Sequence, residues 1–190
     1  RVVGNTLMLA SSLLMYRIGC DWFGRKEALL AAVALQVLPL YFCTGFLATM
    51  DSPLVFFWLL CMLGVTHALR NERPLGWYVA GFALGAAMLS KYTGVAVAGG
   101  AVAMVIVHRP WRRHLLSVHP YLAVVLAGAL FSPVVIWNAR HDWASFRFQF
   151  IDRFEGHAFN FRDPAIFIAY QLLVLTPIVL VMMLWLLSLL

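Results

Sequence analysis

Long apolar runs separated by short polar breaks make up almost the whole chain. The runs lack the ten-residue alternation of membrane β-strands, and their lengths are typical of helices that cross a membrane. We therefore predict about seven membrane segments. They are Val2–Ile18, Glu27–Phe46, Leu54–Leu69, Trp77–Leu89, Val95–Val107, Pro120–Trp137 and Ala165–Leu190. Pro39 should kink the second segment, because a proline removes a helical hydrogen bond.

The runs Trp77–Leu89 and Val95–Val107 can form either one long helix or a hairpin with Lys91 at its tip. One helix would be about 45 Å long, more than a tilted crossing needs. The hairpin keeps all the basic loops on one side, so we adopt it. The positive-inside rule places that side in the cytoplasm, and the break at Asp51, the Lys91 tip and segment 138–164 then share the outer face. The basic loop residues are Arg17, Arg25, Lys26, Arg70, Arg73, Arg109, Arg112 and Arg113.

Composition supports an all-α integral membrane protein. Hydrophobic residues make up 63% of the 190 positions, charged residues make up 12%, and the mean hydropathy is +0.86. A soluble domain is nearer half apolar and a quarter charged. The net charge of +6 comes from loop residues, so it does not indicate nucleic-acid binding. We predict one transmembrane domain over residues 1–190. Because the chain opens on Arg1 and ends inside an apolar run, we expect it to be a fragment truncated at both ends.

The break at Asp51 places one carboxylate between two apolar runs. Asp51 or Ser52 could simply cap the following helix, with Pro53 in its first turn, where the missing N–H costs nothing. Alternatively, an acid at the membrane surface is a candidate for chemistry. Local chemistry alone favours the cap.

Lys91 is the other isolated charge. The helices on either side of it are each about 20 Å long, shorter than the bilayer core, so the tip should lie below the membrane surface. A cation at that depth must snorkel to the interface, form a pair or face a wet cavity. Snorkelling and a functional role both remain open.

Segment 138–164 is polar and aromatic. Trp143, Phe146 and Phe150 recur on one helical face, which predicts an amphipathic helix in the membrane interface that could also act as a lid. Asn138 more often caps a helix than binds a ligand. His141 next to Asp142 could be a general base, although adjacent residues rarely face each other on a helix. No spacing in the chain is typical of a metal site.

Several short motifs occur along the chain in a fixed order. They are Ala48–Trp58, Leu89–Thr93, Trp137–Asn138, His141, Trp143, Ser145–Phe146 and Phe148–Gln149. Each motif is short, but their order and spacing together are fairly specific. Taken together they resemble those of the glycosyltransferase family 39 membrane enzymes, which include bacterial relatives of protein O-mannosyltransferases and lipid A aminoarabinose transferases.

The resemblance implies a GT-C polytopic helical bundle with its active site on the outer face of a membrane, such as the bacterial inner membrane. Such enzymes pass a sugar, with inversion, from a polyprenyl-phosphate carrier to a hydroxyl of a lipid, glycan or protein acceptor. No further cofactor is implied, and participation of a divalent metal stays open. The family's main catalytic acid lies in the first outer loop, which would precede Arg1. We therefore expect this fragment to lack it.

Carried over residue by residue, the resemblance assigns Asp51 as the second outer-face acid, which supports the acceptor or the catalytic base. Lys91 matches the basic position that binds the carrier phosphate in the family. Tyr92 adjoins Lys91 and is a further candidate on the donor side. Asn138, His141 and Trp143 are candidates for lining the cavity or the acceptor side.

Two other interpretations remain. A secondary transporter or lipid flippase also carries intramembrane charges and helices broken by Gly and Pro, but the chain shows no paired inverted halves. The chain could also be a non-catalytic subunit or a degenerate relative of the same fold. The sequence upstream of Arg1 would discriminate, since the transferase requires one span followed by an outer loop that contains an acid.

Overall fold

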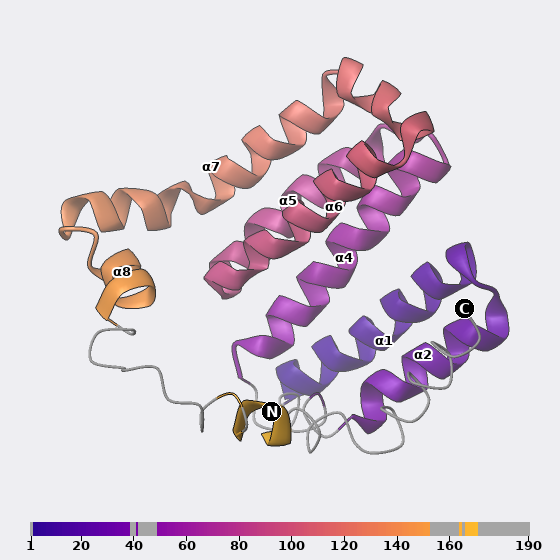
Figure 1. Ribbon diagram of the computed structural model, residues 1–190, viewed down its shortest axis with the longest axis horizontal. Helices are drawn as coiled ribbons and strands as arrows, with labels where there is room; N and C mark the ends of the chain where they lie inside the picture. Colours follow the sequence, from indigo (N-terminus) through magenta and orange to yellow (C-terminus); the bar gives the residue numbers. More distant parts are fainter. Residues whose placement is uncertain (1, 39–40, 42–48, 153–163, 165, 171–190) are drawn as a thin grey trace.

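Every regular element in the described part of the chain is helical. The computed structural model describes residues 2–38, 41, 49–152, 164 and 166–170. Its elements in chain order (Figure 1) are α1 (Val2–Trp22), α2 (Arg25–Val37), α4 (Asp51–Arg70), α5 (Leu75–Ser90), η1 (Tyr92–Val95), α6 (Ala96–Val107), η2 (Arg109–Leu116), α7 (His119–Arg140), α8 (Ala144–Arg147) and η3 (Phe148–Asp152). The all-α prediction is confirmed over these residues.

The number of membrane-crossing helices is smaller than expected. Within the described residues, only α4 and α7 are long and apolar enough to cross, and a third crossing results if Tyr92–Val107 and η2 count as one bent span. The prediction of about seven segments is therefore not supported. Polar side chains lower the hydropathy of α1, α2 is only 13 residues long, and α5 is a shorter apolar helix. The kink at Pro39 and most of the last predicted run lie outside the described residues.

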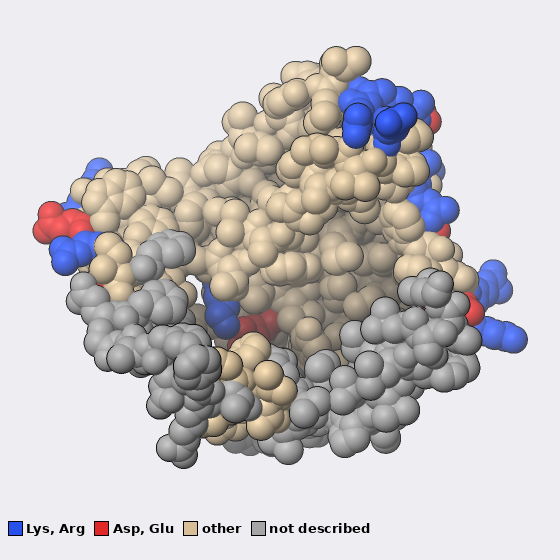
Figure 2. Space-filling view, viewed as in Figure 1, with Lys and Arg blue, Asp and Glu red and all other residues tan. Residues whose placement is uncertain are grey.

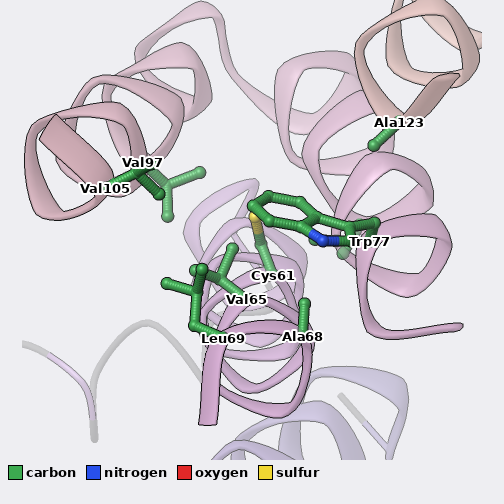
Figure 3. Close-up of a cluster of buried hydrophobic side chains, with 10 residues drawn as sticks. Cys61, Val65, Ala68, Leu69, Trp77, Val97, Val105 and Ala123 are labelled. Carbon is green, nitrogen blue, oxygen red and sulfur yellow. The ribbon is translucent and has the colours of Figure 1, made fainter. Parts of the chain in front are cut away.

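Small residues bring α4, α5 and α7 into close contact. A Cβ added to Gly64 of α4 would lie 2.7 Å from the backbone nitrogen of Ala80 in α5. One added to Gly81 of α5 would meet the carbonyl oxygen of Ala123 in α7. Such contacts are typical of membrane helix pairs, because small residues let the backbones approach. Trp77 of α5 fills the centre of the core that these helices share with α6 (Figure 3).

The α1–α2 hairpin packs on the other side of α4. Gly19 lies against Ala28, and a Cβ at Gly19 would be 2.7 Å from the Ala28 Cα. Gln36 of α2 donates from Nε2 to the Ser12 Oγ of α1 over 2.6 Å, which satisfies polar groups between the two helices. Trp22 at the end of α1 donates from Nε1 to the Thr66 Oγ1 of α4 over 3.1 Å. These contacts fix the hairpin against α4.

The basic loops lie at one end of the molecule. Arg113, after α6, forms an ion pair with Glu72, before α5, so the stretch between them must reverse direction. The hairpin prediction is thereby confirmed. Arg70 donates to the backbone carbonyl of Asp21, which joins the last turn of α1 to the same end. In Figure 2, Lys and Arg side chains gather along the upper right edge, where the loop between α6 and α7 lies in Figure 1.

Candidate functional site

Asp51 and Lys91 meet at the end of the molecule opposite the basic loops. The Lys91 Nζ donates to the Asp51 Oδ1 over 2.9 Å, although the residues are 40 positions apart in sequence. The Lys91 side chain is 46% exposed and the Asp51 side chain is 38% exposed. The two charges that stand out in the sequence therefore form one ion pair that remains accessible from outside.

Asp51 is presented by the first turn of α4. Met50 occupies the N-cap position and Asp51 is the first helical residue, so the prediction that Asp51 or Ser52 caps this helix is wrong. The helix therefore begins at Asp51 itself, and the Asp51 carboxylate is paired with Lys91. Pro53 lies in the first turn, as expected. A carboxylate in this turn is also stabilised by the positive end of the helix dipole.

Lys91 is presented by a break between α5 and η1. Its backbone is extended, with φ −160° and ψ 139°. The backbone N–H of Gly94 donates to the Lys91 carbonyl over 2.9 Å and folds η1 back onto the end of α5. A Cβ at Gly94 would lie 2.6 Å from the carbonyl carbon of Ala87, so this turn requires glycine. The close turn directs Lys91 to Asp51.

Tyr92 connects this turn to α7 and α8. Its ring contacts Phe131 of α7 edge-on, with the centroids 6.1 Å apart, and Phe146 of α8 at 5.2 Å. Edge-on and offset aromatic contacts are favourable geometries. Tyr92 therefore holds α8 close to the turn that carries Lys91.

Asn138 serves the protein's own backbone. The residue is 0% exposed, and its Nδ2 donates to the Val134 carbonyl over 3.0 Å. Its Oδ1 accepts from the backbone N–H of Ser145 over 3.1 Å. The side chain thus ties the first turn of α8 to the last turn of α7, although Trp143 and not Asn138 occupies the N-cap position of α8.

His141 and Trp143 lie on the surface near this turn. The His141 ring stacks on Trp137 with 4.2 Å between centroids, and its Nδ1 lies 2.7 Å from the Trp137 carbonyl oxygen. Within the part of the chain that the structure describes, His141 forms no ion pair with Asp142. Asp142 and Trp143 both have positive φ, 52° and 57°, which is uncommon for residues other than glycine. This strained turn reverses the chain between α7 and α8.

The predicted interfacial helix is partly observed. The Trp143 and Phe146 rings lie 5.8 Å apart, so these two residues share a side of the chain. The helical segment consists of α8 and the π-helical turn η3. The Phe150 side chain and residues 153–163 lie outside the described residues, and the rest of segment 138–164 therefore stays a prediction.

Two apolar grooves flank Trp58 of α4, and sequence reasoning did not find them. One, of about 390 Å³, lies between α1, α4 and α6 and extends from Trp22 to Ala96. The other, of about 350 Å³, lies between α1, α2 and α4 and reaches Leu54, one turn after Asp51. Because each groove is formed by three helices, no local sequence pattern predicts it. Neither groove is lined by Asp51 or Lys91, but the second extends to within one helical turn of Asp51.

Comparison with known families identifies the family to which this chain belongs. The family model described as dolichyl-phosphate-mannose-protein mannosyltransferase matches residues 1–137. The chain belongs to this mannosyltransferase family. The matched part contains Asp51, Lys91 and Tyr92 and ends just before Asn138. Neither the curated proteins nor the solved structures give a significant match.

Membership of the mannosyltransferase family, with the long apolar helices, identifies an integral membrane protein and supports a membrane glycosyltransferase of the GT-C type. Among the residues that the structure describes, no group of three His, Cys, Asp or Glu side chains could hold a metal ion.

Proposed function

We propose that this chain forms part of a membrane glycosyltransferase that transfers a sugar from a polyprenyl-phosphate carrier to an acceptor hydroxyl, with inversion, on the outer face of the membrane. The observation that supports it most directly is the Asp51–Lys91 pair, which joins an acid and a cation at one accessible point. Family membership supports the reaction class.

Lys91 suits the leaving group of this reaction. When the carrier departs, its phosphate takes the electron pair of the broken bond to the anomeric carbon and gains negative charge. An ammonium group beside a membrane would stabilise that charge more strongly than it could in water. The apolar grooves beside α4 offer space for the isoprenoid tail while the phosphate meets Lys91.

Asp51 suits the acceptor side. A carboxylate can accept a hydrogen bond or the proton from the acceptor hydroxyl as its oxygen forms the new bond to the anomeric carbon. Attack opposite the departing phosphate inverts the configuration. Phosphate binding to Lys91 would compete with the ion pair and release the Asp51 carboxylate for this task. We propose that Asp51 supports the reaction together with a further acid elsewhere in the full-length protein.

The remaining assignments follow from position. Tyr92 adjoins Lys91 and would line the donor side. Trp143 and His141 are exposed near α8 and would line the acceptor side, with Asn138 holding that turn in place. The site would face the periplasm if the protein resides in a bacterial inner membrane. The donor sugar and the acceptor would be identified by mass spectrometry of glycans and lipids from a deletion strain and its parent.

Substitution of the paired charges tests the proposal. In the full-length protein, Asp51→Asn and Lys91→Ala should each lower the transfer rate by about 100-fold or more, because each removes a group that stabilises charge in the transition state. The measurement is transfer of radiolabelled sugar from a polyprenyl-phosphate donor by purified enzyme in detergent.

Arg140→Gln is the matched control, since this exposed charge at the end of α7 has no proposed role in transfer. Its rate should equal that of the wild type. Wild-type rates in well-expressed Asp51→Asn and Lys91→Ala variants would show that the pair is only structural and would overturn the proposal.

A further inference from the structure

The short helix η2 lies across the basic end of the bundle. It leaves the preceding helical stretch, Tyr92–Val107, at an angle of 111° (Figure 1). If α6 runs along the direction in which the bundle crosses a membrane, η2 runs close to the membrane plane. A helix at the end of a spanning bundle in this orientation lies at the level of the lipid headgroups.

One row of η2 side chains faces the protein. Residues three apart share a side of a 3-10 helix, so Trp111 and His114 form one row. The Trp111 ring contacts Trp22 at 5.8 Å, and the His114 ring contacts Trp77 at 6.0 Å. Burial, together with the neighbouring Arg113 guanidinium, lowers the pKa of the His114 imidazole, so this row is uncharged at neutral pH. The packed row fixes which sides of η2 face outward.

The two outward rows divide into a basic beginning and an apolar end. Arg109 and Arg112 are exposed in the first half of the helix, whereas Leu115 and Leu116 are exposed in the second, Leu116 to 92%. Val118, which follows η2, is also exposed. Cationic and apolar groups side by side on an exposed helix are typical of segments that rest in a membrane interface.

Neither Arg109 nor Arg112 has a carboxylate partner among the described residues. The Arg112 Nε donates to the Ile106 carbonyl over 2.7 Å, which orients the guanidinium without neutralising it. Arg113, by contrast, is paired with Glu72. Two uncompensated guanidinium groups with adjacent exposed leucines therefore remain available to a ligand that is both anionic and apolar.

We propose that η2 is a binding site for anionic phospholipids, in which Arg109 and Arg112 contact the lipid phosphate groups and Leu115 and Leu116 enter the acyl region. An anionic lipid matches both halves of the exposed surface. An acidic soluble protein would match the arginines but would leave no reason for Leu116 and Val118 to face outward.

Lipid titration of the full-length protein tests this site. Purified protein is stripped of lipid in detergent and titrated with phosphatidylglycerol or with phosphatidylcholine of the same acyl chains, and bound lipid is counted by native mass spectrometry. The wild type should prefer phosphatidylglycerol several-fold. The R109Q/R112Q variant should lose about an order of magnitude of phosphatidylglycerol affinity and keep its phosphatidylcholine affinity. R109K/R112K, which keeps the charges, should retain most of the preference.

The matched control is R140Q/R147Q, which removes two exposed charges near α8 and should leave the preference unchanged. An unchanged preference in R109Q/R112Q would overturn the proposal, as would an equal loss in R109Q/R112Q and R109K/R112K. Polyglutamate, titrated in the same way, tests the alternative of an acidic protein partner. If polyglutamate binds through Arg109 and Arg112 while the protein shows no preference for phosphatidylglycerol over phosphatidylcholine, the surface fits an acidic protein and the proposed lipid site is wrong.

Discussion

Asp51 and Asn138 show two opposite uses of a polar side chain. The ion pair of Asp51 is partly exposed, and such pairs contribute about 1 kcal/mol or less to stability, so folding alone does not require it. Asn138 is fully buried, and both its amide nitrogen and its oxygen are bonded to backbone. For Asn138 the residue type alone favoured a structural role, because asparagine more often caps a helix than binds a ligand. The pairing of Asp51 with Lys91 had no such signal, because it depends on how α4 and α5 pack.

Replacement of Asn138 should loosen α8. Asn138→Ala leaves the Ser145 N–H without its acceptor and should lower the free energy of unfolding by about 1–3 kcal/mol. Thermal unfolding of the purified protein in detergent measures the effect. His141→Ala, at an exposed position three residues later, should change stability by about 0.5 kcal/mol or less. An equal loss in both variants would refute the anchoring role of Asn138.

Close backbone contacts help to position the helices. Gly64 and Gly81 allow α4, α5 and α7 to approach, whereas Gly99 in α6 has no atom within 4 Å of an added Cβ. Composition could not separate these glycines, because all of them lie in apolar runs. Most of these helices could be predicted from the apolar runs, and the turn at Lys91 could be predicted because the basic loops must share a side. The grooves beside Trp58 and the number of crossing helices could not be predicted from the sequence, since both depend on tertiary packing and exact helix length.

The contrast between the glycines gives a test at this scale. Gly64→Val forces atoms against the α5 backbone and should destabilise the protein by about 1–3 kcal/mol. Gly99→Ala adds a methyl group to open space in a helix and should be neutral or stabilise the protein by up to about 1 kcal/mol. The unfolding midpoints of both variants in one detergent provide the measurement. A Gly64→Val midpoint at or above that of Gly99→Ala would contradict the close α4–α5 contact.

The molecule as a whole has two chemically different ends. One end collects the basic loops, joined by the Glu72–Arg113 pair and by Arg70 with the Asp21 carbonyl. The other carries the Asp51–Lys91 pair together with the α7–α8 turn. The charge pattern of the sequence separated these ends correctly. It could not place the charges within each end, because loop residues far apart in sequence meet only in the folded bundle.

Opposite ends should lie on opposite sides of the membrane. Single cysteines at the exposed positions Arg73 and Arg140, in a background without the native cysteines, should react differently with a membrane-impermeant maleimide added to intact cells. Arg140→Cys should be labelled and Arg73→Cys protected, as the positive-inside rule requires. Permeabilised cells, in which both should react, are the control. Labelling of Arg73→Cys alone in intact cells would invert the proposed orientation.

The Asp51–Lys91 pair also bears on how the protein is made. A lone carboxylate or ammonium that must traverse the hydrocarbon layer is expensive, whereas a contact pair carries no net charge. Lys91 is synthesised 40 residues after Asp51, so the partner of the acid emerges only once α4 and α5 have left the ribosome. We therefore expect the membrane insertion of α4 to cost least when the α5–α6 hairpin inserts together with it.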